Sequence, residues 1–294
     1  MPSRSGVFKE YSGWLLILPI IALLFFVLLL PTLYTLSLSF SRFSLSNPQE
    51  NRFIGLDNYV RLIHDHEFRL SFWISVIFTG VTVPLELAIG LAFALFINRT
   101  FRGRGVIRTL ILLPWALPTA LNAIMWRWLY NTDYGLYNDV LLHLKIIARP
   151  INWLGAVPLA MIAMMIVAIW KTNSFMALIL LAGLQSIPEE LYNAAKIDGA
   201  GRWVSFKEIT LPLLKPAILV ALLFRSMDAF RAFGLPFNLT QGGPGNSTET
   251  LSLYAYKSFF QFLKFDYASA MAVVQFACLF ALGLFYIRAL RVEL

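Results

Sequence analysis

Ionisable side chains inside long apolar segments are the residues of this chain best placed to do chemistry. A charged group within a membrane is costly, so by default it marks a functional site. Six side chains meet this description: Glu86, Arg127, Lys171, Arg225, Asp228 and Arg231. Arg225, Asp228 and Arg231 are three positions apart, which places them on one side of a helix with the carboxylate between two cations. This spacing fits either an ion-paired ladder that holds helices in register or a polar patch that lines a water-filled pathway.

A second pattern that could hold a ligand is the segment WKTNSF, residues 170–175. Thr172 and Phe175 are three positions apart and share a helix face, and Lys171 precedes Phe175 by four positions. A lysine beside a hydroxyl and an aromatic ring suits sugar binding, because sugars need hydrogen-bond partners and a flat apolar platform. The alternative is that Lys171 pairs with Asp228 while Phe175 faces lipid.

The other two intramembrane charges have different settings. Arg127 lies near the end of its apolar segment, so its long side chain is expected to extend toward the membrane surface. Glu86, in TVPLELAIG, is either a packing or pairing residue or a contact for a solute.

Other kinds of site receive little support. Cys278 is the only cysteine and cannot form a disulfide within the chain. His64 and His66 form an H-x-H pair without further clustered ligands, so we expect a solvated loop and no metal site. The glycine-rich segment 242–247 lacks the lysine and hydroxyl of a phosphate-binding loop. No catalytic set stands out, so the sequence indicates neither an enzyme nor a cofactor in this chain.

The elements that position these side chains follow from composition. Hydrophobic residues make up 59% of the 294 residues and charged residues 14%, whereas soluble domains are nearer half apolar and a quarter charged. A membrane span needs about 20 mostly apolar residues. Six stretches meet that length, at about 13–38, 71–97, 106–130, 156–182, 209–237 and 267–288. The sequence therefore predicts an all-α polytopic bundle of six transmembrane helices within a single domain, 1–294, and a first span that is retained because it lacks a cleavage site.

Lysine and arginine counts predict the orientation of the bundle. One set of connections holds eleven in 56 residues: 1–12, 98–108, 183–208 and 288–294. The other set holds eight in 86 residues: 39–70, 131–155 and 238–266. By the positive-inside rule, both termini and the 183–208 loop are cytoplasmic. The net charge of +8 is then explained by topology and by the anionic headgroups of membrane lipids, with no need for nucleic acid as a partner.

The 183–208 loop contains a polar stretch, EELYNAAKIDGAG, between two apolar segments. Pro188 suits the start of a helix, and Glu189 and Glu190 suit its positive N-terminal end. Gly199 and Gly201 are expected to end this short cytoplasmic helix, Gly199 at a position that needs a left-handed backbone. The helix either lies in the headgroup plane or serves as a docking element for a cytoplasmic partner.

The segment SIPEELYNAAKIDGAGRWVSFKEITLPLLKP resembles the EAA loop of the permease subunits of binding-protein-dependent ABC importers. RTLILLPWALPTALNAIMWRWLYN and FNLTQGGPG are similar to the sugar-permease branch, the maltose-type and glycerol-phosphate-type subunits. Together these blocks cover about residues 70–290. The resemblance implies a bacterial or archaeal cytoplasmic membrane, a second permease subunit that is a distinct paralogue, two cytoplasmic ATPase subunits that carry ATP and Mg, and an extracytoplasmic solute-binding protein.

The resemblance also implies two sets of site residues. The coupling helix, seated in a cleft of the ATPase, would use Glu189, Glu190, Asn193, Ala194, Ala195, Asp198 and Gly199. The transport site, on the spans that flank this loop, would use Lys171, Thr172, Phe175, Arg225, Asp228, Ala229 and Ala232. Asn193 stands where the family usually has a glutamate, so its contact with the ATPase is neutral or Glu189 and Glu190 supply the charge.

Two classes of solute are compatible with these residues. A neutral sugar or polyol would use Asp228 as an acceptor for hydroxyls and Phe175 or Phe230 as a stacking surface. An anionic polyol phosphate or sugar acid would pair with Arg225 or Lys171. The neutral solute is favoured, because Asp228 can satisfy one cation and still accept hydroxyl groups. A secondary transporter is a more distant alternative, since no internal repeat is evident.

Overall fold

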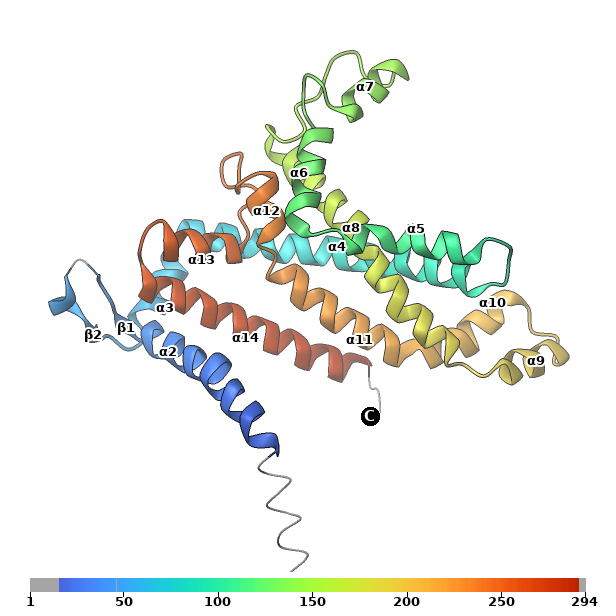
Figure 1. Cartoon of the computed structure of the whole chain (residues 1–294), viewed down its shortest axis with the longest axis horizontal. Helices are drawn as coiled ribbons and strands as arrows, with labels where there is room; N and C mark the ends of the chain where they lie inside the picture. Colours follow the sequence, from blue (N-terminus) through green and yellow to red (C-terminus); the bar gives the residue numbers. More distant parts are fainter. Residues whose placement is uncertain (1–15, 46, 291–294) are drawn as a thin grey trace, which may run out of the picture. The chain divides into compact units, whose positions relative to one another are not determined.

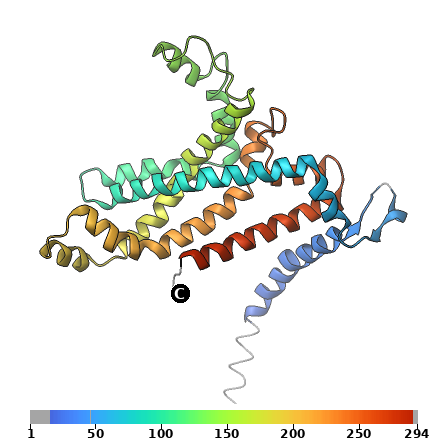
Figure 2. The same ribbon diagram turned by 180° about the vertical axis from the view of Figure 1, so that it is seen from behind.

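The computed structural model describes residues 16–45 and 47–290, and the fold is helical apart from one short strand pair. Contacts divide the described residues into two compact units, those up to residue 65 with 255–274 and residues 66–254 with those from 275 onward. The chain termini and residues 13–15 of the first expected span lie outside the described residues. Figures 1 and 2 show the helices from opposite sides.

The first unit begins with an apolar helix, Leu16–Ser39, whose later part is the π-helical turn η1 (Phe25–Leu29) and α2 (Leu30–Ser39). The rest of this unit comprises β1 (Ser41–Arg42), η2 (Pro48–Glu50), β2 (Arg52–Phe53) and α3 (Asp57–His64), and it takes in the end of α13 (Leu251–Phe260) and the start of α14 (Phe265–Leu290). Buried Asn58 donates to the carbonyl oxygens of Ser39 and Ser41, which fixes α3 against the strand pair.

The second unit is built around α8 (Val157–Gln185), which packs against α4 (His66–Asn98), α5 (Arg104–Ala116) and α11 (Leu211–Phe230). Small residues allow two close helix crossings. A β-carbon on Gly90 of α4 would lie 2.6 Å from the Met176 β-carbon of α8, and one on Gly183 of α8 would lie 2.5 Å from the Ala217 β-carbon of α11. Such contacts between small residues are typical of helix packing in membranes.

The third expected span, 106–130, is not one straight helix. It consists of α5 and α6 (Thr119–Leu129), which meet at an angle of 95°. The break falls at Leu117 and Pro118, both with extended backbone, because a residue before proline is pushed out of the helical region. Pro84 lies within α4 and Pro216 within α11, whereas Pro118 interrupts the helix.

The fifth expected span, 209–237, also ends earlier than predicted. The π-helical turn η3 (Phe206–Thr210) leads into α11, which stops at Phe230, and a separate short helix, α12 (Gly234–Leu239), follows. Arg231 is therefore the C-terminal cap of α11 and does not continue the helix face that carries Arg225 and Asp228. Apolar composition through residue 237 cannot distinguish one long helix from a helix, a turn and a second helix.

Five described helices are long and apolar enough to cross a membrane, and the number rises to six if the bent pair α5 and α6 counts as one span. Helices α4, α8 and α14 start and end within five residues of the second, fourth and sixth expected spans. In both views, α9 (Glu189–Ile197) and α10 (Arg202–Ser205) lie at the same end of the second unit as the α4–α5 turn. Helices α6, α12 and α7 (Leu136–His143) lie at its other end.

Candidate functional site

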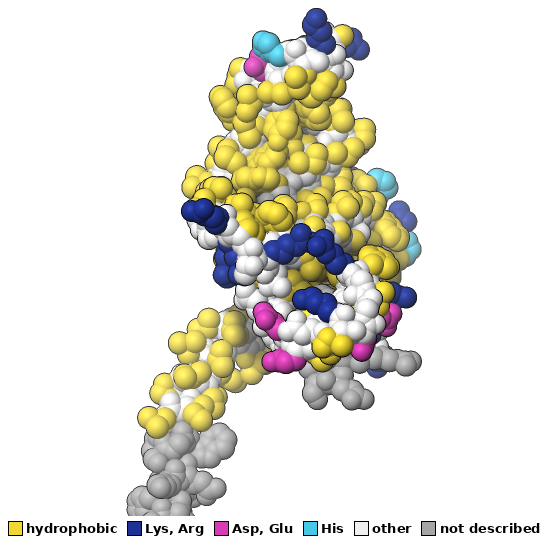
Figure 3. All heavy atoms as spheres, turned by 90° about the vertical axis from the view of Figure 1, so that its right-hand side faces the viewer, with side chains coloured by type: hydrophobic (Ala, Val, Ile, Leu, Met, Phe, Trp, Pro, Cys, Tyr) yellow, Lys and Arg dark blue, Asp and Glu magenta, His cyan; other side chains and the backbone are white. Residues whose placement is uncertain are grey.

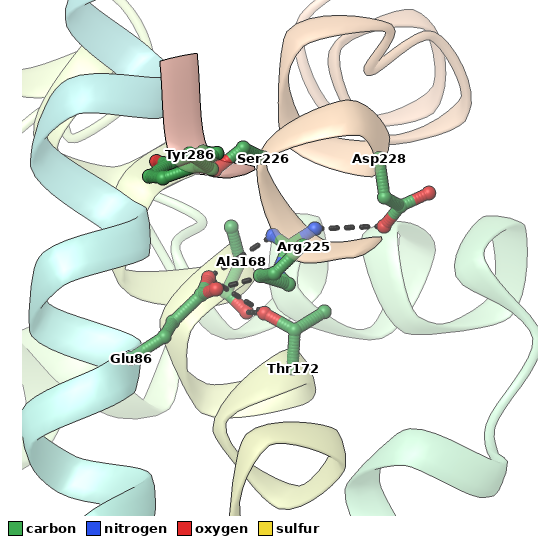
Figure 4. A network of polar contacts seen from close by, with 7 residues as sticks. All are labelled: Glu86, Ala168, Thr172, Arg225, Ser226, Asp228 and Tyr286. Carbon is green, nitrogen blue, oxygen red and sulfur yellow. Dashed lines mark hydrogen bonds and ion pairs between the residues drawn. The ribbon is translucent and has the colours of Figure 1, made fainter. Parts of the chain in front are cut away.

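The centre of the candidate site is a buried network between α4 and α11. The carboxylate of Glu86 accepts hydrogen bonds from Nε and Nη2 of Arg225, and the Nη2 bond measures 3.0 Å. Asp228 Oδ2 accepts a third bond of 2.7 Å from Nη1 of Arg225. Figure 4 shows the two carboxylates on opposite sides of the guanidinium. Charge-assisted, two-pronged bonds of this kind are among the strongest in proteins.

Burial differs sharply across this network. The side chains of Glu86 and Arg225 are 0% and 4% exposed, whereas that of Asp228 is 61% exposed. A buried charge persists only when it is paired, so Glu86 and Arg225 depend on each other. Asp228 is therefore the most exposed of the three charged side chains.

Thr172 of α8 connects a third helix to the network. Its hydroxyl lies 2.6 Å from Glu86 Oε1 and 2.6 Å from the carbonyl oxygen of Ala168. The side chain of Lys171 points elsewhere, and its amine donates to the carbonyl oxygen of Trp115 at 3.3 Å. The α4–α8–α11 core is therefore joined by polar contacts that converge on Glu86.

A cavity of about 430 Å³ opens beside this network. Its walls come from α4, α5, α6, α8, α11 and α12, and its polar lining includes Lys171, Thr172, Arg225, Asp228 and Arg231. A second cavity of about 230 Å³ shares Trp115, Thr172 and the three charged residues of α11 and its cap. Polar groups that converge in an otherwise apolar pocket are typical of a small-molecule site.

The structure brings the predicted transport residues to these cavities. Lys171, Thr172, Arg225, Asp228, Ala229 and Ala232 line the larger cavity, and Phe175 lines the smaller one. Phe175 stacks on Trp115, with ring centroids 5.9 Å apart. The interpretation of Phe175 as a lipid-facing residue is therefore wrong.

Three other details of the sequence interpretation are corrected. Lys171 is not paired with Asp228: its amine donates to the Trp115 carbonyl oxygen, and Asp228 pairs with Arg225. The ladder does not extend to Arg231, which has no carboxylate within 4.0 Å among residues 16–45 and 47–290. Phe230 is not a stacking surface in the cavity, since it is 6% exposed and packs against Phe72.

Sequence reasoning underestimated Glu86 and missed Trp115. Glu86 was one of several intramembrane charges, but its central place depends on how α4, α8 and α11 pack. Trp115 lies in an apolar segment beside Pro114, and its carbonyl is free to accept from Lys171 because α5 ends at Ala116. The only sequence feature that could have singled out Trp115 was its position next to a proline.

The segment between α8 and α11 presents the predicted coupling residues at the surface. Helix α9 starts at Glu189, after Pro188, and Gly199 has the expected left-handed backbone with φ of +78°. Glu189, Glu190, Asn193, Ala194, Asp198 and Gly199 are exposed, and Ala195 is partly exposed. The hydroxyl of Tyr192 lies 3.0 Å from that of Thr210, which ties α9 to the last residue of η3, just before α11.

Charged side chains mark the end of the second unit that carries α9 and α10. Figure 3 looks toward this end and shows Lys and Arg side chains with acidic side chains around them, next to large hydrophobic surfaces. Ile197 and Trp203 are 86% and 73% exposed within the same segment. Lys196 donates to Asn193 Oδ1 at 3.4 Å, so this amide is held by its own helix.

Known proteins resemble this chain over nearly its whole length. It is 42% identical to the trehalose/maltose transport system permease protein of Thermococcus litoralis, over 95% of this chain and 93% of that protein. It is 41% identical to the sulfoquinovosyl glycerol transport system permease protein of Agrobacterium fabrum, over 95% and 90%. Its fold matches the crystal structure of a bacterial ABC transporter involved in the import of the acidic polysaccharide alginate, with a TM-score of 0.85, 22% identity and coverage of 98% and 97%.

Residues 86–292 match the family described as the binding-protein-dependent transport system inner membrane component. This region contains the buried network, the smaller cavity, the lining of the larger cavity apart from Phe78, and the α9–α10 segment. The chain therefore belongs to the binding-protein-dependent inner-membrane permeases of ABC importers.

Proposed function

We propose that the chain forms half of the translocation pathway for a sugar or sugar-like solute. The observation that carries this proposal is the charged, partly exposed network at Asp228 that opens into a cavity within an apolar helix core. Two relatives are named for transport of trehalose/maltose and of sulfoquinovosyl glycerol, which supports a sugar or a sugar conjugate. Both compact units would belong to one permease domain, 1–294.

The proposed topology has six spans, with the bent α5–α6 pair as the third and both termini in the cytoplasm of a bacterium or archaeon. Helix α9 would then be a cytoplasmic coupling helix. Two cytoplasmic ATPase subunits, which bind ATP and Mg, would press on Glu189–Gly199 and rock the bundle between inward-facing and outward-facing states. The exposed surface of α9 and its anchorage through Tyr192 support this role.

The complete importer would contain two further components. A second permease, a distinct paralogue, would supply the other half of the pathway. An extracytoplasmic solute-binding protein would deliver the solute to the outer loops, and the description of the family as binding-protein-dependent supports such a partner.

A neutral solute fits the cavity better than an anion. Asp228 satisfies Arg225 with one carboxylate oxygen and is 61% exposed, so its remaining acceptor sites are available to hydroxyl groups. Lys171 and Trp115, which lie side by side in the cavity wall, add a donor and an apolar platform. An anionic sugar acid or polyol phosphate is the alternative, because Lys171 and Arg231 also line the cavity.

The proposal is tested by uptake in proteoliposomes that contain the two permeases, the ATPases and the binding protein. Radiolabelled maltose and trehalose are the probes. We expect uptake that requires both internal ATP and the binding protein, and a catalytically inactive ATPase serves as the control. Uptake driven by an ion gradient without ATP would instead identify a secondary transporter.

A further inference from the structure

The Glu86–Arg225–Asp228 network has an uneven distribution of charge. Two carboxylates surround one guanidinium, so the cluster carries one net negative charge when all three groups are ionised. Glu86 is completely buried against Nε and Nη2, and the excess negative charge therefore falls on Asp228, the exposed member. Through Asp228, its most exposed member, the cluster presents a hydroxyl acceptor to the cavity that Arg225 also lines.

The other charged residues of the cavity are cations, so the neutralisation of Arg225 by Glu86 affects the net charge that a solute meets. Lys171 and Arg231 line the same space, and in the described part of the chain neither has a carboxylate within 4.0 Å. Were Arg225 uncompensated as well, three cations would face a single carboxylate. A carboxylate or phosphate on a solute would then find a strongly attractive site, since a guanidinium binds both with two parallel hydrogen bonds.

We propose that Glu86 is a specificity-determining residue that makes the cavity select neutral polyhydroxylated solutes over anionic ones. It acts as a positioning residue through Arg225, whose Nε–Nη2 edge it occupies and whose charge it neutralises. Thr172 holds the Glu86 carboxylate in place from α8. This inference rests on the proposed function, because it assigns a solute class to the same cavity.

A purely structural role for Glu86 makes a different prediction. A clamp between α4 and α11 would change the stability of the complex but not its relative affinity for neutral and anionic solutes. The ratio of two affinities, measured on assembled complexes, therefore separates specificity from stability.

The test uses the complete importer in nanodiscs, without binding protein, so that delivery does not determine which solute reaches the cavity. The probes are radiolabelled maltose and maltobionate, a neutral disaccharide and its carboxylate counterpart. Glu86→Gln keeps the side-chain shape and an acceptor oxygen but removes the charge. We expect it to raise the maltobionate-to-maltose affinity ratio about tenfold, the scale of one charge-assisted hydrogen bond.

Two control variants isolate the cause. Glu86→Asp keeps the charge and should leave the ratio close to that of the parent. Glu67→Gln makes the same chemical change on the same helix, at a residue outside both cavities that accepts a hydrogen bond from Asn246, and it should leave the ratio unchanged. A ratio that rises equally in Glu67→Gln would overturn the proposal.

Arg225→Gln provides a second, independent test in case Glu86→Gln does not assemble. If Glu86 already withholds Arg225 from the solute, Arg225→Gln should leave the ratio within about twofold of the parent, because the solute loses no hydrogen bond from the guanidinium. A tenfold loss of maltobionate binding in Arg225→Gln would show that Arg225 serves the solute directly, and the proposal would be wrong.

The outcomes also separate this inference from the proposed function. Maltose binding by the parent with no change of ratio in Glu86→Gln rejects the role of Glu86 and leaves the sugar permease intact. If the parent neither binds nor imports maltose but Glu86→Gln gains maltobionate binding, the role of Glu86 is supported and the sugar assignment is rejected. Binding of neither probe by any variant rejects both.

Discussion

Glu86 of α4 and Arg225 of α11 are 139 residues apart in the sequence and form a two-pronged, fully buried ion pair. The pair joins two helices that also pack directly on each other and on α8. Because neither charge can reach water, each one stabilises the fold only while the other is present.

Removing one partner of this pair should therefore be costly, whereas removing both should be tolerated. Arg225→Ala leaves the Glu86 carboxylate buried without its cation, and we expect the protein to lose about 3–5 kcal/mol of folding stability. The double variant Glu86→Leu with Arg225→Met leaves no buried charge and should recover most of that loss. Thermal unfolding of the purified complex in detergent measures both. Additive losses in the double variant would contradict the interdependence of the pair.

The sequence was sufficient to identify the charged residues of the site but not their pairing. Helical spacing placed Arg225 and Asp228 on one face, and the 2.7 Å contact confirms that local relationship. The partner of Arg225 on α4 could not be predicted, because periodicity within one helix does not determine which neighbour it meets. Arg231 was misplaced for a related reason, since the end of α11 depends on tertiary contacts and not on hydropathy.

Helix boundaries were likewise predictable from the sequence only in part. Long, strongly apolar segments predicted α4, α8 and α14 well, because hydropathy alone sets their length. The break at Pro118 was missed, since proline is tolerated in membrane helices wherever neighbours satisfy the freed carbonyls. The left-handed Gly199 was predicted correctly, because helix termination by glycine is a local property of the backbone.

The crossing of α4 and α8 at Gly90 predicts a sharp contrast between two glycines of one helix. A β-carbon at Gly90 would meet Met176 at 2.6 Å, whereas one at Gly80 has no atom within 4 Å. Gly90→Ala should destabilise the protein by about 1–3 kcal/mol through overpacking. Gly80→Ala, the matched control, should be neutral or stabilise it by about 0.5–1 kcal/mol. Equal effects of both variants on the melting temperature would contradict this packing.

The backbone at Gly199 predicts an effect on energy coupling. Leucine at this position would be strained at a φ of +78°, although no atom lies within 4 Å of an added β-carbon. We therefore expect Gly199→Leu to distort the end of α9 and to reduce ATPase stimulation by loaded binding protein, with little loss of membrane assembly. Gly105→Leu, at an open glycine without positive φ, is the control. If ATPase stimulation and transport stay at the parent level in Gly199→Leu, the proposed coupling role is wrong.

The proposed topology predicts which loops face the cytoplasm. Single cysteines at His143 and Gln261, in a Cys278→Ser background, should react with an impermeant maleimide in intact cells. Cysteines at Thr100 and Lys207 should react only after the membrane is permeabilised. All four positions are exposed, so a failure to react reports the compartment and not burial. The reverse pattern would place α9 outside the cell and exclude its contact with an ATPase.

The exposure of Asp228 predicts how the solute is recognised. In a pathway for neutral sugars, the carboxylate accepts hydroxyl hydrogens, and a lost charge-assisted hydrogen bond costs about 1.5–3 kcal/mol. Asp228→Asn should therefore reduce uptake of a neutral sugar about tenfold or more. Asp139→Asn removes an exposed carboxylate from α7, outside both cavities, and should leave uptake unchanged.

An anionic solute reverses the expectation for Asp228. The same substitution then removes a repulsive group, so uptake should hold or rise, whereas Arg225→Gln should abolish it. Initial rates of uptake in proteoliposomes, at solute concentrations below and above KM, distinguish the two cases because a lost binding contact raises KM more than it lowers kcat. Full uptake of the natural solute by Asp228→Asn, together with none by Arg225→Gln, would contradict a neutral solute and would instead make Arg225 the anion receptor of the cavity.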